Sequence, residues 1–82
     1  MGFIFGKYMI YLKFADGSKG YFMHKEGNHL MVTSDVANAE KYMSQNSAAN
    51  YFYNHDLASG SNSNFSRVAE AYVYTDGKYF RM

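Results

Sequence analysis

The stretch KYMIYLKFADGSKGYFMHK, residues 7–25, decides the fold of this chain. In its first part, 7–14, every second residue is large and apolar, which is the repeat of a β-strand with one buried face. Residues 16–20 then supply turn residues, and residues 21–25 resume an aromatic, strand-forming run. The stretch therefore predicts a β-hairpin.

Two further turns extend the sheet in both directions along the chain. The turn at 26–28 leads into residues 29–33, which predict a third strand. Near the end of the chain, Asp76-Gly77 separates 68–75 from 78–82 and is the preferred two-residue turn of a β-hairpin. We therefore expect an antiparallel sheet of about five strands.

A helical region lies between these strands, from Ser34-Asp35 to about Asn54. Ser34 or Asp35 has the side chain of an N-cap, and Ser44 is a good internal N-cap. Apolar residues recur at helical spacing on both sides of residues 42–44, so the pattern also suits two short helices with a kink there.

The helical region is expected to cover one face of the sheet. The order βββ-α-ββ indicates a single small α+β domain over residues 1–82. Residues 58–66 are polar and predict a mobile surface loop, with packing restarting at Phe65.

Composition favours binding over catalysis. The chain has nine tyrosines and seven phenylalanines in 82 residues, with no cysteine, proline or tryptophan. Eight basic residues stand against seven acidic ones, so the summed electric field is too weak to mimic DNA or to steer the chain to nucleic acid. The apolar start, residues 1–6, lacks a basic leader and is too short to span a bilayer, so we expect a soluble cytoplasmic protein without a membrane partner.

Two groups of residues have side chains suited to chemistry. His24, Glu26 and His29 flank a turn and are expected on one face, where they suggest zinc, but no further residue has ligand spacing, so ordinary surface histidines are preferred. His55-Asp56 suggests an acid–base pair without a nucleophile beside it, and a histidine at a helix C-terminus is preferred. We therefore expect no enzyme, no cofactor and no metal.

The aromatic residues indicate a protein interface, because tyrosine offers a large apolar body with one polar tip and few rotamers to lose. The candidate partner-binding residues are Tyr51, Tyr53, Tyr72, Tyr74, Tyr79, Lys13 and Arg81.

Single-stranded nucleic acid is the second hypothesis, with bases stacked on a sheet flanked by basic residues. The aromatic candidates are Tyr11, Tyr21, Phe22, Tyr72, Tyr74 and Tyr79, and the basic candidates are Lys7, Lys13, Lys25, Lys78 and Arg81. A third hypothesis is a homodimer, in which a structural or virion accessory protein pairs identical faces.

Residues 21–52 resemble the very small accessory proteins of bacteriophages and mobile elements. The shared pattern is an aromatic strand, a Gly turn with an apolar second strand, an Asp followed by Ala-x-x-aromatic, and a Ser-capped helix carrying Ala. Its positions here are Gly27, Asn28, His29, Leu30, Asp35, Ala39, Tyr42, Ser44 and Ala48. The resemblance implies an anti-defence context such as an anti-CRISPR inhibitor, which binds a host protein or ribonucleoprotein complex, for example a CRISPR effector, in fixed stoichiometry.

Overall fold

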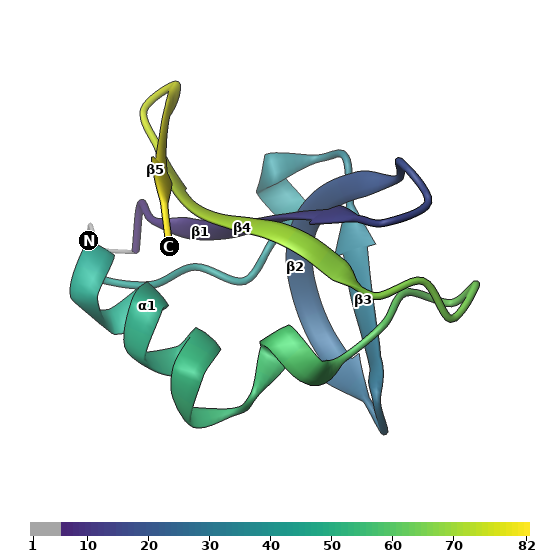
Figure 1. The fold of residues 1–82 in the computed structure, drawn as a ribbon. Helices are drawn as coiled ribbons and strands as arrows, with labels where there is room; N and C mark the ends of the chain where they lie inside the picture. Colours follow the sequence, from purple (N-terminus) through teal and green to yellow (C-terminus); the bar gives the residue numbers. More distant parts are fainter. Residues whose placement is uncertain (1–5) are drawn as a thin grey trace.

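A five-stranded antiparallel sheet, in the order β3-β2-β1-β4-β5, is the frame of the computed structural model, which describes residues 6–82 (Figure 1). The strands are β1 (Met9–Phe14), β2 (Lys19–Glu26), β3 (His29–Thr33), β4 (Val68–Thr75) and β5 (Lys78–Arg81). The prediction of an α+β domain with an antiparallel sheet of about five strands is confirmed. The residues before Gly6 lie outside the described part of the chain.

Strand β1 lies in the middle of the sheet and is paired on both sides. From Ile10 onward its residues alternate as expected: Ile10, Leu12 and Phe14 are buried, while Lys13 is exposed and Tyr11 is half-buried. Met9, at the start of the strand, departs from this alternation because it is buried as well. The buried set faces the helix, so the sheet has one packed face and one open face.

The turns follow from residues that tolerate a positive φ. Asp76 and Gly77 have φ values of 50° and 78°, as a type I′ hairpin turn requires. This confirms the terminal hairpin, which stands out from the rest of the sheet in Figure 1. Gly27 has a φ of 61°, as in the first central position of a type II′ turn.

The helical region is shorter than the sequence predicts. Val36–Asn38 form one 3₁₀ turn, η1, and the α-helix α1 covers only Gln45–Asn54. Residues 39–44 form no helix, because backbone groups in this segment bond to β2 and to the residue before β1: Glu40 N donates to Phe22 O over 2.9 Å, and Tyr42 N donates to Tyr8 O over 2.8 Å.

The predicted caps of the helical region are present. Ser44 Oγ accepts from Ser47 N over 3.0 Å and starts α1, as predicted. Asp35 caps η1 by accepting from Ala37 N over 2.9 Å.

The core lies between the sheet and α1, which Figure 1 shows below the sheet. Two residues of α1, Ala48 and Phe52, pack into it together with Leu57 of the short 3₁₀ turn η2 (Leu57–Ser59). The sheet contributes Ile10, Leu12, Phe14, Phe22, Leu30, Ala71 and Val73.

The polar segment 58–66 is tied to the sheet through Asn62, whose side chain is only 6% exposed. Asn62 Nδ2 donates to Asp16 Oδ2 over 3.1 Å and to Ser18 Oγ over 2.8 Å. Its Oδ1 accepts from the backbone N–H groups of Asn64 and Ser66, both over 2.9 Å. One amide thus joins this segment to the turn between β1 and β2.

The prediction that packing restarts at Phe65 is wrong, since Phe65 is 76% exposed and has a φ of 64°. Its ring lies at the edge of the sheet, 5.0 Å from the ring of His29. Packing restarts earlier, at Leu57, and continues in β4.

Replacing Asn62 with alanine should lower the free energy of unfolding by about 2–3 kcal/mol, because the four hydrogen bonds of a buried amide are lost. Chemical denaturation of the full chain measures this change. Asn64→Ala is the matched control, and its effect should stay within about 0.5 kcal/mol because its side chain is exposed. Equal effects of the two variants would show that Asn62 is not an anchor.

Replacing Tyr42 with phenylalanine should raise the free energy of unfolding by about 1 kcal/mol. Among the described residues, the Tyr42 hydroxyl is buried without a hydrogen-bond partner, and an unpaired buried hydroxyl is costly. Tyr53→Phe is the control, because the Tyr53 side chain is 61% exposed. A lower unfolding midpoint for Tyr42→Phe would reveal a partner for this hydroxyl.

Candidate binding face

The open face of the sheet carries a group of five tyrosines that we call the tyrosine face. Its members are Tyr11 on β1, Tyr21 on β2, Tyr72 and Tyr74 on β4, and Tyr79 on β5. Tyr11 lies directly opposite Tyr21 and Tyr72, and Tyr74 lies opposite Tyr79. Since opposite residues of paired strands point to the same side, four strands present these rings together.

The rings of the tyrosine face support one another. The ring centroids of Tyr11 lie 4.9 Å from Tyr21 and 5.0 Å from Tyr79, and those of Tyr74 lie 5.1 Å from Tyr21 and 4.8 Å from Tyr79. These separations and the tilted or edge-on angles are those that aromatic pairs prefer. The Tyr21 and Tyr79 hydroxyls are 3.0 Å apart, within hydrogen-bond distance. The face is therefore held in one arrangement before any partner arrives.

Three hydroxyl groups of this face, those of Tyr11, Tyr21 and Tyr72, have raised pKa values and stay neutral at physiological pH. Burial raises the pKa of Tyr21, and the hydrogen bond with Tyr79 raises it further. Burial also raises the pKa of Tyr11, with Tyr79 adding to it. The Tyr72 hydroxyl donates to Glu70, which raises the pKa of Tyr72 and lowers that of Glu70. Tyr11, Tyr21 and Tyr72 therefore offer neutral donors and acceptors.

Basic side chains border the tyrosine face. The Lys13 ammonium lies 5.5 Å from the centroid of the Tyr72 ring, and the Arg81 guanidinium lies 5.9 Å from it. Both distances are within the range of cation–π attraction. Lys13 Nζ is also 4.0 Å from Glu70 Oε1.

Lys13 also lies directly opposite Lys19 on the neighbouring strand β2. Two like charges in this position destabilise a sheet. Within residues 6–82, Glu70 forms an ion pair with Lys13, but no acidic side chain forms an ion pair with Lys19. The two ammonium groups therefore repel each other at the rim of the face.

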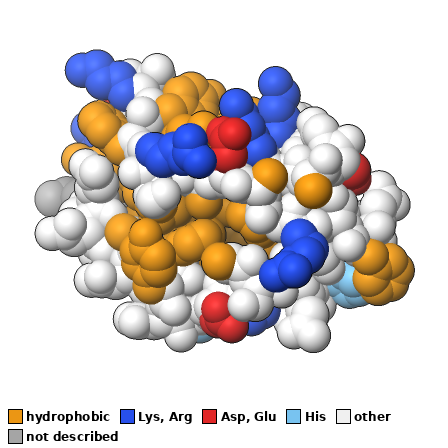
Figure 2. Space-filling model, viewed as in Figure 1, with side chains coloured by type: hydrophobic (Ala, Val, Ile, Leu, Met, Phe, Trp, Pro, Cys, Tyr) orange, Lys and Arg blue, Asp and Glu red, His pale blue; other side chains and the backbone are white. Residues whose placement is uncertain are grey.

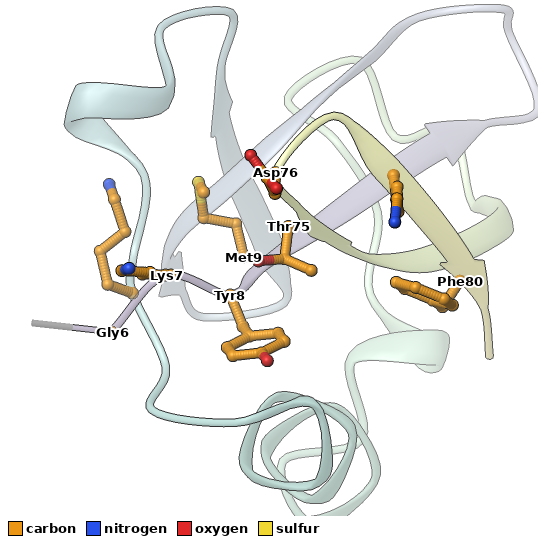
Figure 3. A pocket seen from close by; sticks show the side chains of 9 residues that line it. Gly6, Lys7, Tyr8, Met9, Thr75, Asp76 and Phe80 are labelled. Carbon is orange, nitrogen blue, oxygen red and sulfur yellow. The ribbon is translucent and has the colours of Figure 1, made fainter.

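Two hollows lie near the candidate residues on the described part of the surface. A shallow one of about 340 Å³ lies on the tyrosine face, between Tyr11, Lys13, Lys19, Tyr72 and Tyr79. A larger one of about 770 Å³ lies where the start of β1 faces the β4–β5 turn. The rings of Tyr8 and Phe80 line it at separate places (Figure 3). Its lining mixes apolar side chains with Lys7, Lys41, Lys78 and Asp76.

The charged side chains on the side drawn in Figure 2 are dispersed. Figure 2 shows one side of the molecule, where apolar and aromatic side chains are exposed and Lys and Arg side chains lie in separate places around them. No broad basic patch is visible in this view, in agreement with the formal net charge of +1.

The structure brings together five of the seven candidate partner-binding residues: Tyr72, Tyr74, Tyr79, Lys13 and Arg81. It separates them from Tyr51 and Tyr53, which belong to α1 on the other side of the sheet. Tyr51 packs against Tyr42 with 5.3 Å between centroids and stacks on His55 at 3.9 Å. Tyr53 is exposed but lies away from the tyrosine face.

The nucleic-acid hypothesis includes Tyr11 and Tyr21, and the structure places both on the tyrosine face. It was wrong to include Phe22, which is fully buried in the core and offers no surface to a base. Lys25 points toward α1 and donates to His55 O over 3.0 Å. Lys7 and Lys78 line the larger hollow instead.

The histidines do not converge on a metal site. His24 Nε2 lies 2.7 Å from Glu26 Oε2, whereas His29 Nδ1 lies 3.1 Å from the backbone oxygen of Asn62. In residues 6–82, no three His, Asp or Glu side chains form a cluster suited to a metal ion.

Comparison with protein-family models, with curated proteins and with solved structures finds no significant match for this chain. The described part of the chain contains no helix with the length and hydrophobicity needed to cross a membrane.

Replacing Lys19 with glutamate should raise the free energy of unfolding by about 0.2–1 kcal/mol, because a repulsive cross-strand pair becomes attractive. Urea denaturation at low ionic strength measures the gain, and added salt should reduce it. Lys78→Glu is the matched control, since it changes the charge equally but lies opposite Thr75. A gain of the same size in both variants would attribute the effect to net charge alone.

Proposed function

We propose that this protein is a non-enzymatic binding protein that docks its tyrosine face onto a partner protein. The observation that carries the proposal is the preorganised group of five tyrosines on the open side of the sheet. Tyrosine is enriched at protein interfaces, and a fixed ring loses little entropy on binding. The opposite side of the sheet is covered by α1, so the tyrosine face is the surface of the sheet that remains for a partner.

Tyr79 is the residue most suited to anchor the partner. Its side chain is 48% exposed, yet its ring touches those of Tyr11 and Tyr74 and its hydroxyl contacts that of Tyr21. A ring that is exposed and rigid is typical of an interface hot spot. The half-buried neighbours around it would exclude water from the contact.

The biological context that we propose is that of a mobile-element inhibitor of a bacterial defence system. The support for this context is the resemblance of residues 21–52 to small bacteriophage accessory proteins. The partner would be a host protein or ribonucleoprotein complex in the cytoplasm, such as a CRISPR effector. Nearly balanced charge favours docking by shape over imitation of DNA.

Binding of single-stranded nucleic acid is a second candidate, which the positions of Lys13 and Arg81 beside the Tyr72 ring support. Stacking rings flanked by cations are the usual features of a single-strand platform. Affinity for a single strand would then fall steeply with added salt.

Affinity capture from a nuclease-treated bacterial lysate that contains defence complexes tests the docking proposal. The tagged wild type should retain a protein in fixed stoichiometry, and Tyr79→Ala should weaken this binding at least tenfold, or by about 1.4 kcal/mol or more. The thermal midpoints of unfolding should show that both proteins remain folded.

Tyr53→Ala is the matched control, because it removes an exposed tyrosine from the other side of the sheet and should leave binding unchanged. Equal binding by Tyr79→Ala and wild type would reject the tyrosine face as the contact. Capture of a partner from an untreated lysate but not from the nuclease-treated one would favour the nucleic-acid candidate.

A further inference from the structure

A pair of lysines lies at the rim of the tyrosine face. Lys13 and Lys19 lie directly opposite each other on β1 and β2, and both line the hollow of about 340 Å³. Repulsion between them costs folding free energy, and violations of local rules of this kind are expected at functional sites. An anion between the two ammonium groups would turn the repulsion into attraction.

The charge around the hollow indicates which anion fits. Lys13, Lys19 and Arg81 are three cations near the hollow, and Glu70 is the carboxylate that pairs with this group, which leaves a net charge of +2. Glu70 also accepts a hydrogen bond from the Tyr72 hydroxyl, and this bond holds the Glu70 carboxylate at one side of the hollow. A phosphate monoester carries a charge of about −1.5 to −2 at neutral pH, whereas a carboxylate or a phosphodiester carries −1.

Three tyrosine rings border the hollow and give a planar group an aromatic surface to lie on. Tyr11, Tyr72 and Tyr79 surround it, with ring centroids 5.0–6.3 Å apart and rings inclined to one another by 50–84°. A nucleobase stacks on tyrosine rings irrespective of its sequence identity. A volume of about 340 Å³ is at the small end of ligand sites, which fits a single nucleotide.

We propose that this hollow binds one nucleotide with a terminal phosphate, whose phosphate lies between Lys13 and Lys19 and whose base contacts the tyrosine rings. The nucleotide is either free or the phosphorylated end of a single strand. The proposal goes beyond the protein-docking function and does not rest on it, because it concerns the lysine rim and not the exposed Tyr79 anchor alone.

Two-dimensional amide NMR of the ¹⁵N-labelled full chain, titrated with 5′-AMP at low ionic strength, tests the proposal. Saturable shifts should appear at Tyr11, Lys13, Lys19, Tyr72 and Tyr79. Adenosine and inorganic phosphate should each bind at least tenfold more weakly, since each supplies half of the contacts. Absence of saturation with 5′-AMP would overturn the proposal.

Variants then locate the phosphate. Lys19→Gln should weaken 5′-AMP binding about tenfold, because it removes one charge-assisted contact. Lys78→Gln removes the same charge from the other hollow and should leave the affinity within twofold. Equal loss in both variants would show non-specific attraction and overturn the site. Lys19→Gln should stay folded, since Lys19 is exposed and its removal relieves repulsion.

Two further probes distinguish the source of the nucleotide. A 5′-phosphorylated hexathymidylate should bind more tightly than the same strand without its terminal phosphate. Affinity above that of 5′-AMP would identify the strand end as the ligand, and affinity no greater than that of 5′-AMP would identify the free nucleotide. Equal affinity of the two strands, or tighter binding of phenyl phosphate than of 5′-AMP, would overturn the proposal, the latter in favour of a phosphorylated tyrosine side chain.

Discussion

The pairing of β1 with a strand on each side is the constraint on which the rest of the structure depends. Because its side chains alternate, Ile10 and Leu12 close the core against α1, while Tyr11 and Lys13 stand in the middle of the opposite face. A slip of one residue in this strand would exchange the two sets and place Lys13 in the core. The same register therefore secures both the hydrophobic packing and the geometry of the tyrosine face.

Local patterns made much of the fold predictable. Alternation over 7–14, the Asp76-Gly77 turn and the Ser44 cap each act within a few residues, and the structure contains the elements that they predict. The observed helix is shorter than the predicted one, because the backbone N–H groups of Glu40 and Tyr42 bond to residues far away in the sequence. Asn62 was missed for the same reason, since an asparagine in a polar stretch gives no sign of burial.

The candidate site was predictable in its residue types but not in its arrangement. Tyrosine content and strand alternation were enough to single out Tyr72, Tyr74 and Tyr79 on the last hairpin. These three residues lie beside Tyr11 and Tyr21 because β1 lies between β2 and β4, and only the folded chain shows this strand order. The opposition of Lys13 and Lys19 depends on the register of a single strand pair. Alternation alone leaves that register open.

The tie between Asn62 and the β1–β2 turn has a consequence for how the chain reaches its native state. Asn62 bonds to Asp16 across 46 positions, and β1 pairs with β4 over a larger separation. Contacts this distant in the sequence slow folding, because a long loop must close before they form. During synthesis, β1 to β3 leave the ribosome before β4. Until β4 follows, the edge of β1 that pairs with β4 has no partner. That open edge makes the nascent chain most prone to aggregate in the interval before β4 arrives.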